Sequence, residues 1–396
     1  MILSAEVSSA DTSSIKVEGW VNIQDKKFYP YQSSLRNKMK NAMGIRLKSK
    51  TKGFSSNLTF SINNENKILF DETNLNYRLK NITFGLGKIS RQWSFSPNTS
   101  LILSKNARPT TSAYIIINDF VSKKNKSQSM LDAWSIEFFN SLLKGSNNPN
   151  KSMLLGTRIL FSPINNLDFE LIKVSQWGGE GNNNGPSAFK AAFLGDSNDG
   201  KNSNINQIAG FGISYTIPKD IYPIRVYGQF IGEDEAGNLP SCYIYLGGTE
   251  IPYYNGKYKQ NFGLEITDTR IKFTSHGNCG PNTAYNNNTY KYTNYGQVMG
   301  APIDTEGRSI KLWSDIKLSR KFKIMYSLEN VLINDTNWLN HRISSSRQNN
   351  WNGEASFSWA TNKFKFIGGI TKQGLDLDKL NIKSGLGIYI HSAVKF

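Results

Sequence analysis

Three consecutive carboxylic acids, Glu233, Asp234 and Glu235, are the residues best suited to chemistry in this sequence. Glycosidases cleave sugar bonds with a pair of carboxyl groups, one of which keeps its proton in an apolar environment. Here the acids stand on a loop between Gly232 and Gly237, with no apolar surround to raise a pKa. No Gly-x-Ser-x-Gly elbow accompanies the serines and histidines. We therefore predict no catalytic residue, and a protein that is not an enzyme.

Metal ligands are scarce in the chain. A structural zinc site uses four Cys or His ligands held close together. The sequence offers only Cys242, Cys279, His276, His341 and His391, which are widely spaced. We predict neither a metal nor a cofactor. The two cysteines could form a disulfide in an oxidising compartment, but the sequence does not decide whether they pair.

Aromatic and planar polar side chains favour carbohydrate as the ligand. Sugars are bound by rings packed against their C–H faces and by amides and carboxylates bonded to their hydroxyls. Tyrosines are also expected in the aromatic girdles of a membrane barrel. The acidic triplet would equally suit a loop salt bridge or a divalent-cation site. The candidate carbohydrate-binding residues are Trp177, Glu233, Asp234, Glu235, Tyr245, Tyr253, Tyr254, Tyr285 and Tyr290.

The C-terminal residues show which elements position these side chains. Alternate residues at the end of the chain form an apolar face that only a serine interrupts, and period-two alternation is typical of a strand with two different faces. Such an end, closing on Phe, resembles the last strand of bacterial outer-membrane barrels, although an edge strand of a soluble sandwich would also fit. The face consists of Leu386, Ile388, Ile390, Ser392, Val394 and Phe396.

Connections between the predicted strands fall into two classes. The short turns are Lys80-Asn81, 162–166, 218–223 and Ser319-Arg320. The long loops, rich in Gly, Asn and aromatic residues, are 178–208, 232–258, 276–308 and 334–350. Short periplasmic turns at one end and long extracellular loops at the other are typical of an all-β, antiparallel transmembrane barrel of the outer membrane. The length accommodates about 16 to 18 strands.

The amino-acid composition is the one expected of a barrel, and the net charge limits the chemical class of the partner. Only 38% of the 396 residues are hydrophobic, and no apolar run approaches the roughly 20 residues of a spanning helix. A membrane location therefore requires a closed barrel. The net charge of +17 favours an anionic polymer or lipopolysaccharide phosphates. The basic residues are spread out and form no recognisable nucleic-acid module, so we expect no nucleic-acid partner.

Three segments resemble the Wzi family of capsule assembly proteins. They are Gly85–Pro97 with Leu101–Pro109, Tyr227–Gly237 with Leu239–Ser241 and Tyr245–Gly248, and Gly263–Thr269 with Ala284–Asn286 and Gly296–Gly300. The resemblance implies an outer-membrane barrel of 18 strands that holds capsular polysaccharide at the cell surface as a lectin. It also implies an N-terminal helical bundle on the periplasmic side, from which this chain departs because strand-like alternation already begins at Ile15.

Together these observations predict one outer-membrane barrel domain over residues 15–396, preceded by a tail over residues 1–14. We expect a bacterial outer-membrane monomer of about 18 strands, in contact with membrane lipid and lipopolysaccharide. Its predicted function is to bind capsular or another surface polysaccharide and attach it to the cell. The alternative is an outer-membrane porin with a basic, anion-preferring lumen.

Overall fold

The computed structural model describes most of the chain. Described are residues 13–29, 41–118, 133–195, 204–218, 221–236, 239–254, 256, 258–273 and 279–396, without the side chains of 234–236 and 239. Of the tail predicted for residues 1–14, residues 1–12 lie outside this part. The first strand begins at Ser14. Among the described residues, no helix is long and apolar enough to cross a membrane.

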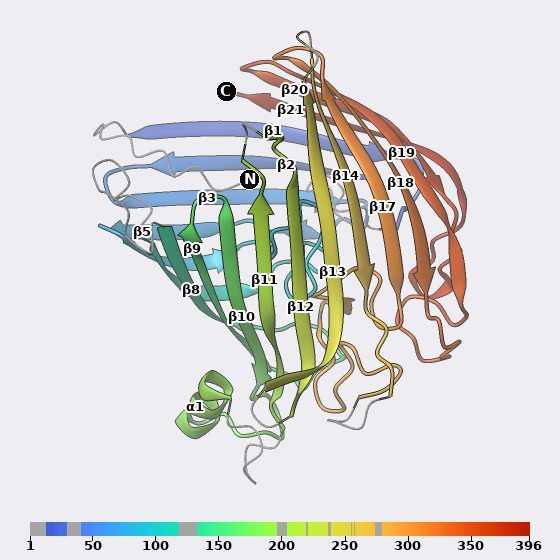
Figure 1. Ribbon diagram of the computed structural model, residues 1–396. Coiled ribbons are helices and arrows are strands. Elements are labelled where there is room, and N and C mark those ends of the chain that lie inside the picture. Colours follow the sequence, from blue (N-terminus) through green and yellow to red (C-terminus); the bar gives the residue numbers. More distant parts are fainter. Residues whose placement is uncertain are drawn as a thin grey trace.

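Antiparallel strands form a closed ring (Figure 1). The first strand, β1, pairs with both β2 and the last strand, β21, and this pairing closes the sheet. The sheet has 19 strands, but the short β4 (Ile68–Leu69) pairs with β3 alone, which leaves 18 in the ring. The ring strands are β1 (Ser14–Gln24), β2 (Asn41–Lys50), β3 (Phe54–Asn63), β5 (Asn74–Leu79), β6 (Ile82–Lys88), β7 (Thr111–Asn118), β8 (Ala133–Leu142), β9 (Met153–Ile164), β10 (Leu167–Trp177), β11 (Asn206–Thr216), β12 (Arg225–Ala236), β13 (Leu239–Tyr254), β14 (Lys259–Asp268), β17 (Arg308–Lys317), β18 (Phe322–Ile333), β19 (Gln348–Ala360), β20 (Phe364–Gln373) and β21 (Gly385–Lys395).

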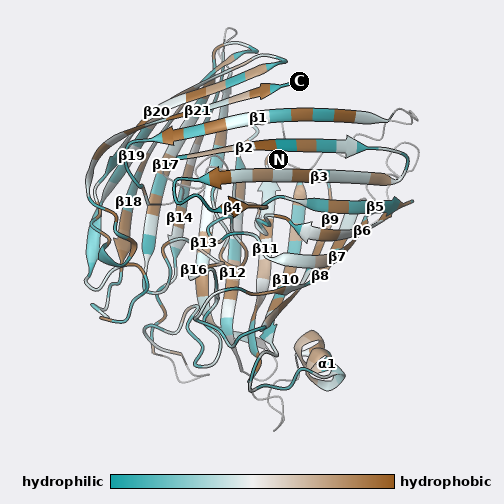
Figure 2. Ribbon diagram, turned by 180° about the vertical axis from the view of Figure 1, so that it is seen from behind, coloured by the Kyte–Doolittle hydropathy of each residue, from teal (hydrophilic) through white to brown (hydrophobic). Residues whose placement is uncertain are grey.

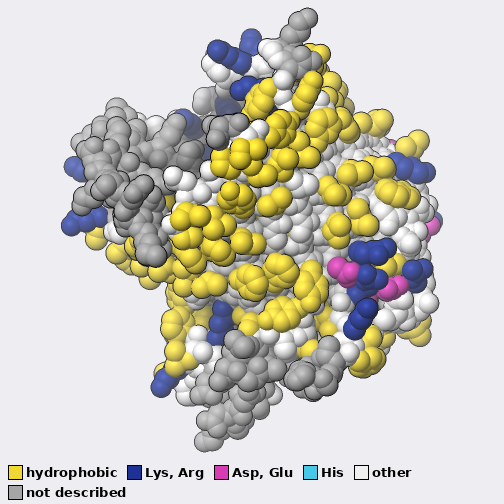
Figure 3. All heavy atoms as spheres, viewed as in Figure 1, with side chains coloured by type: hydrophobic (Ala, Val, Ile, Leu, Met, Phe, Trp, Pro, Cys, Tyr) yellow, Lys and Arg dark blue, Asp and Glu magenta, His cyan; other side chains and the backbone are white. Residues whose placement is uncertain are grey.

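Side chains alternate between an apolar outer wall and a polar inner wall. In β21, Leu386, Ile388 and Ile390 are exposed on the outside, whereas Tyr389 and His391 are buried inside. The alternation predicted from the C-terminal residues is therefore confirmed. Figure 2 shows brown and teal residues alternating along β1, and Figure 3 shows hydrophobic side chains gathered over the outside of the barrel. An outer wall of this kind is suited to lipid, so the chain is an outer-membrane barrel.

The inner wall carries ion pairs between neighbouring strands. Arg158 of β9 contacts Glu170 of β10 at 2.5 Å, and Arg225 of β12 contacts Glu250 of β13 at 2.9 Å. A polar interior that faces water or packed polar loops is expected of a barrel of this size.

The two ends of the barrel differ as predicted. At one end, here called the short-turn end, strands join through 51–53, 80–81, 165–166, 217–224, 255–258, 318–321 and 361–363, and through 119–132, which lies outside the described part. At the other, here called the loop end, the connections are 25–40, 64–73, 89–110, 143–152, 178–205, 237–238, 269–307, 334–347 and 374–384. The short hairpin strands β15 (Thr293–Asn294) and β16 (Gln297–Val298), the helix α1 (Pro186–Leu194) and the turn η3 (Asp378–Leu380) all lie in these loops.

One predicted loop is wrong. Residues 232–258 form the end of β12, the 16-residue strand β13 and a short turn, instead of one long connection. Along β13, Ile244 and Leu246 are buried inside whereas Tyr245 is exposed outside, which is the alternation of a strand. Gly247, Gly248 and Pro252 gave this segment the composition of a loop, but the pairing with β12 and β14 accommodates all three.

Candidate functional site

The loop over residues 89–110 folds into the loop end of the barrel lumen. Leu101 and Ile102 are fully buried there, together with Trp93. The Trp93 ring packs edge-on against Phe139 of β8, with ring centres 5.3 Å apart, and its Nε1–H donates to Glu137 at 3.2 Å. The apolar run Leu101–Leu103 is therefore the packed interior of an inserted loop.

Polar side chains of the inner wall hold this inserted loop. Gln229 of β12 accepts a hydrogen bond from the Leu101 N–H at 2.8 Å and donates one to the Trp93 carbonyl at 2.6 Å. Glu265 of β14 accepts from the Ser96 hydroxyl at 2.5 Å. Because buried polar groups are costly when unpaired, these bonds fix both the depth and the orientation of the loop.

A second loop, residues 269–307, packs against the first. Tyr285 and Tyr292 are stacked 5.7 Å apart, and their hydroxyls donate to the carbonyls of Leu101 and Ile102 at 2.6 and 2.7 Å. The Ser104 N–H donates to the Met299 carbonyl at 2.7 Å. The two loops therefore form one packed unit across the loop end of the lumen, here called the plug (residues 91–106 and 284–303).

A disulfide ties the second loop to the wall. Cys242 of β13 and Cys279 are bonded, and both are buried. Cys242 adopts a left-handed backbone conformation with φ of 54°. The pairing that the sequence left open is thus present in the structure. It anchors the loop eleven residues after the last residue of β14, Asp268 (279 minus 268).

Removing the disulfide should loosen the plug while the barrel stays folded. We expect the double variant Cys242→Ser, Cys279→Ser to lower the free energy of local opening of the 269–307 loop by about 2 kcal/mol, because the crosslink limits the open state. Limited trypsin digestion measures the opening, which should appear as faster cleavage at Lys291 in the double variant than in the wild type. Wild-type protein treated with reductant is the matched control, and equal cleavage rates with and without the disulfide would contradict the expectation.

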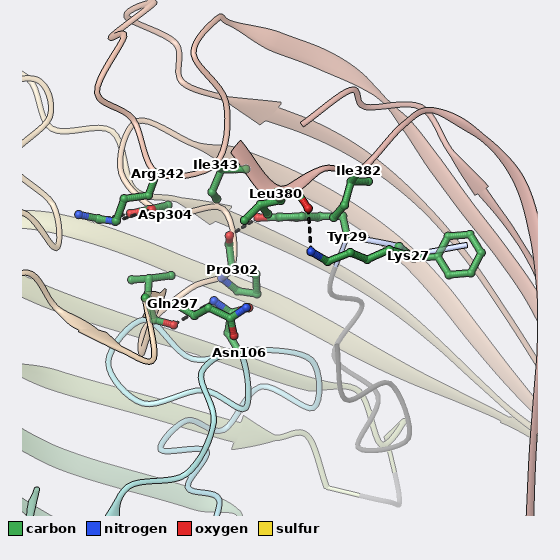
Figure 4. A pocket seen from close by; sticks show the side chains of 13 residues that line it. Lys27, Tyr29, Asn106, Gln297, Pro302, Asp304, Arg342, Ile343, Leu380 and Ile382 are labelled. Atoms are coloured by element: carbon green, nitrogen blue, oxygen red, sulfur yellow. Dashed lines mark hydrogen bonds and ion pairs between the residues drawn. The ribbon is translucent and has the colours of Figure 1, made fainter. Parts of the chain in front are cut away.

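An open pocket lies beside the plug at the loop end (Figure 4). It has an empty volume of about 470 Å³ including its mouth. The lining residues are 27–29, Asn106, 296–298, Pro302, Asp304, 342–343, Leu380 and Ile382. At its base the Tyr29 hydroxyl donates to the Pro302 carbonyl. Both residues also line a second pocket on the lumen side, so the pair forms the wall between the mouth and the interior.

The pocket is charged as well as apolar. The Arg342 guanidinium donates to the Asp304 carboxylate, with Nε 2.8 Å from Oδ2. Burial would raise the pKa of Asp304, but the Arg342 charge outweighs it and the pKa lies below its usual value. Lys27 is exposed at the rim and donates to the Leu380 carbonyl at 2.7 Å. The pocket therefore offers fixed donors and acceptors of the kind that sugar hydroxyls need.

An exposed tyrosine stands next to this pocket. Tyr295 is at the tip of the β15–β16 hairpin in a left-handed conformation (φ of 52°) and is 38% exposed. The guanidinium of Arg108 lies 4.2 Å from the centre of its ring. Asp71 holds Arg108 through two bonds of 2.8 and 2.9 Å. One ring face is thus fixed by a cation–π contact, in keeping with a rigid platform for a ligand on the other face.

Three neighbouring contacts hold the hairpin in place. The Lys144 N–H donates to the Asn294 side chain at 2.9 Å, and the Asn294 amide donates to the Arg108 carbonyl at 2.8 Å. On the other side, Asn106 donates to the Val298 carbonyl at 2.9 Å. The two loops before β7 and β9 therefore position Tyr295. Tyr295 is not among the residues predicted to bind carbohydrate, because nothing local in the sequence distinguishes it from the other loop tyrosines.

Among the predicted site residues, those at the loop end are mostly structural in their contacts. Trp177 is buried at the end of β10 and donates to Asn140 at 3.3 Å. Tyr290 is buried and donates to the Gly178 carbonyl at 2.7 Å, and burial raises its pKa to about 12. Burial also raises the pKa of Tyr285 well above its usual value. Glu233 is buried and accepts from the Tyr285 N–H at 2.6 Å.

The other predicted residues lie elsewhere. Tyr245 faces outward from β13, and Tyr253 and Tyr254 are exposed at the opposite, short-turn end of the same strand. Asp234 and Glu235 lie in β12, and their side chains are outside the described part. The structure thus brings Glu233 and Tyr285 into contact and places Tyr245, Tyr253 and Tyr254 elsewhere. The sugar-binding role of all nine residues stays a prediction.

His341 lies in the 334–347 loop and should make the closure of this loop dependent on pH. The ring is buried, Nε2–H donates to the Thr305 carbonyl at 3.0 Å, and Nδ1 accepts from the Ile343 N–H at 3.2 Å. Burial lowers the pKa of His341 below 6.5. Below about pH 6.5 the opened loop therefore binds a proton that the closed loop excludes, and closure weakens as the pH falls.

Hydrogen exchange can detect this weakening. After correction for intrinsic exchange, the Ile343 amide should lose protection between about pH 7 and pH 5. A His341→Asn variant has no titrating ring and should show a flat profile. Constant protection in the wild-type protein over this range would contradict the expected linkage.

Among the described residues, no group of three or more His, Cys, Asp or Glu side chains is placed to hold a metal ion. The side chains at the pocket and its rim carry rings, amides and paired charges.

Comparison with known proteins places this architecture in a family. The chain is similar to Wzi of Escherichia coli, described as an outer-membrane protein of group 1 capsule assembly and a carbohydrate-binding β-barrel. The TM-score is 0.82 at 20% identity, with 96% of this chain and 84% of that one covered. OccK2 (OpdF) of Pseudomonas aeruginosa is similar at a TM-score of 0.55 and 7% identity, with 97% of each chain covered. Both likenesses show the fold.

A curated relative and a family model supply the sequence evidence. An uncharacterized 55.8 kDa protein in the cps region of Klebsiella pneumoniae is 30% identical over 190 residues. The match covers 48% of this chain and only 38% of that relative's length. The family model of the capsule assembly protein Wzi matches residues 3–366. Because that match takes in almost the whole chain, the chain belongs to the Wzi family of capsule assembly proteins.

Proposed function

We propose that this barrel binds capsular polysaccharide at its loop end and so attaches the capsule to the outer surface of the cell. The observation that carries the proposal is the Tyr295 platform, an exposed ring held on Arg108 beside the charged pocket. A sugar ring stacked on the exposed Tyr295 ring would place its neighbour close to the pocket, because the next two residues, Gly296 and Gln297, line that pocket.

Capsular polysaccharide of the host is the proposed partner, in keeping with the family and with the excess of positive charge. We propose binding without turnover, since the acidic residue of the triplet whose side chain is described, Glu233, is engaged with the Tyr285 backbone. Lipid and lipopolysaccharide around the barrel, and a monomeric state, complete the proposal.

The rival function is a porin, and the plug argues against it. A porin needs an open, water-filled lumen, whereas the two plug loops pack across the loop end through buried side chains such as Leu101 and Tyr285. The ion pairs of the inner wall also neutralise part of the basic charge that an anion-preferring lumen would need.

A pair of tyrosines tests the proposal. Tyr295→Ala should weaken binding of the host's purified capsular polysaccharide about tenfold, because it removes the stacking face, worth about 1.4 kcal/mol. Tyr258→Ala is a matched control, since Tyr258 is 38% exposed, as Tyr295 is, but lies just before β14 at the short-turn end. Surface plasmon resonance on detergent-purified protein gives both affinities.

In the cell, deletion of the gene should release capsule into the medium while synthesis continues. Complementation with the Tyr258→Ala variant should restore cell-bound capsule, and complementation with Tyr295→Ala should restore less. Equal affinities of the two variants would remove Tyr295 from the site. Unchanged cell-bound capsule after deletion would contradict the attachment function itself.

A further inference from the structure

Helix α1 packs against the outside of the barrel, beside β10 (Figure 1). The ring of Phe189 lies 5.6 Å from that of Trp177. The Ser175 hydroxyl donates to the Ala192 carbonyl at 2.8 Å, and Lys173 Nζ donates to the Phe193 carbonyl at 3.2 Å. Since β10 runs toward the loop end, these contacts show that α1 descends the outer wall, away from the loops, with its C-terminus leading.

These contacts explain polar residues on a wall that is otherwise apolar. Lys173 and Ser175 face the same side as the exposed Leu171. Both donate to the last carbonyls of α1, which have no partner within the helix and carry its negative dipole end. The helix thus covers two groups that would be costly against lipid, and its small residues Ala188 and Ala192 pack on the wall.

The exposed face of α1 is graded along its axis. Ser187 and Lys190, in the first two turns, are exposed and polar. Phe193 and Leu194, at the descending end, are 47% and 62% exposed and apolar. A helix surrounded by water gains nothing by exposing its largest apolar side chains at one end. A helix that enters a membrane boundary would carry this gradient.

The descending end also reaches the level of an aromatic girdle. Leu171 is two residues before Lys173 in β10 and faces the same side. On the outer wall it lies beside its cross-strand neighbour Phe211, followed across the sheet by Phe230 and Tyr245. The Phe211 and Phe230 rings are 5.2 Å apart, and those of Phe230 and Tyr245 are 5.8 Å apart. In outer-membrane barrels such girdles mark the boundary between acyl chains and headgroups.

We propose that α1 is an interfacial helix that binds the outer-leaflet lipid beside the barrel. Phe193 and Leu194 lie among the first methylene groups of the acyl chains, and Lys190 lies at the level of the phosphates. The lipid contact of the barrel therefore extends from the strands to a loop element. The helix fixes the height of the 178–205 loop above the membrane, independently of whether the barrel binds a polysaccharide.

Spin labels at two positions of the same helix test this. The native cysteines are bonded to each other, so Leu194→Cys and Ser187→Cys can each be labelled alone in protein reconstituted into phosphatidylcholine vesicles. At position 194 oxygen should relax the label more strongly than a water-soluble nickel chelate. At position 187 the nickel chelate should relax the label more strongly than oxygen. Phe193→Cys provides a second apolar position should the first variant assemble poorly.

Either of two results would overturn the proposal. Stronger relaxation by nickel at positions 193 and 194, as at 187, would place the whole helix in water. Exclusion of both relaxers, with dipolar broadening between labels, would show that a second copy of the chain covers the face instead of lipid. Polysaccharide binding by the same labelled protein, measured in parallel, separates this outcome from a failure of the attachment function.

Discussion

Replacing Trp93 with alanine is expected to release the inserted 89–110 loop and open the lumen. Trp93 is 2% exposed, packs on Phe139 and donates to Glu137. Truncation of a buried Trp costs about 3–5 kcal/mol, the larger part from lost contacts and the cavity left behind. The plug is a local unit on a rigid barrel, so the loss should appear as loop opening instead of global unfolding.

Planar-bilayer recordings measure the effect directly. Wild-type protein should be silent or nearly so, whereas the Trp93→Ala variant should show sustained conductance and faster tryptic cleavage at Lys105. Leu86→Ala, on the lipid-facing side of β6 where the side chain is 60% exposed, is the matched control and should stay silent. A variant that remains closed although correctly folded would show that the second plug loop seals the lumen by itself.

The second large effect concerns the outer wall. Ile45 lies near the middle of β2, is 58% exposed, and neighbours the equally outward Phe60. An arginine there would stand in the hydrocarbon region, and such substitutions near the membrane midplane destabilise outer-membrane barrels by about 2–4 kcal/mol. The Ile45→Arg variant should therefore unfold from vesicles at clearly lower urea than the wild type.

The neighbouring inward positions supply the control. Arg46 already faces the lumen, where it contacts Glu18 at 3.4 Å. Lys48 lies on the same side of β2, and a Lys48→Arg variant should keep the wild-type urea midpoint. If Ile45→Arg proved as stable as Lys48→Arg, the wall formed by Ile45 and Phe60 would not face lipid.

The architecture was largely predictable because alternate residues of a barrel strand face lipid and lumen, and are therefore alternately apolar and polar. The β21 strand, from Leu386 to Lys395, shows this clearly, as do the short turns at Lys80-Asn81 and Ser319-Arg320. The prediction failed at β13, where Gly247, Gly248 and Pro252 suggested a loop. Local composition could not show that β12 and β14 supply hydrogen-bond partners on both sides of that segment.

The plug was beyond local patterns, since its partners are far apart in the chain. Ser96 meets Glu265 across 169 residues, and Leu101 meets Gln229 across 128. Yet each of these residues lies in one of the segments that resemble the Wzi family. That resemblance therefore marked the residues that seat the plug, and it did not single out the exposed surface that we propose for sugar.

Candidate site residues were harder to predict for a related reason. Tyr245, Tyr254, Tyr290 and Tyr295 look alike in the sequence, but one faces outward from the wall, one stands at the opposite end, one is buried and one is an exposed platform. What separates them is the turn at Gly296 and the contact with Arg108, both products of the folded structure. Residue type alone carried no such information.

The route of the inserted loop also sets an order on assembly. The 89–110 segment has its anchors on β8, β12 and β14, and its cover comes from Met299. These partners are not all in place until at least β14 has joined the sheet, so the 89–110 segment cannot make its full set of contacts while the later strands are added. Because the inner wall is polar, water can occupy the lumen during this delay. The lumen closes only when the plug packs, late in the assembly of the barrel.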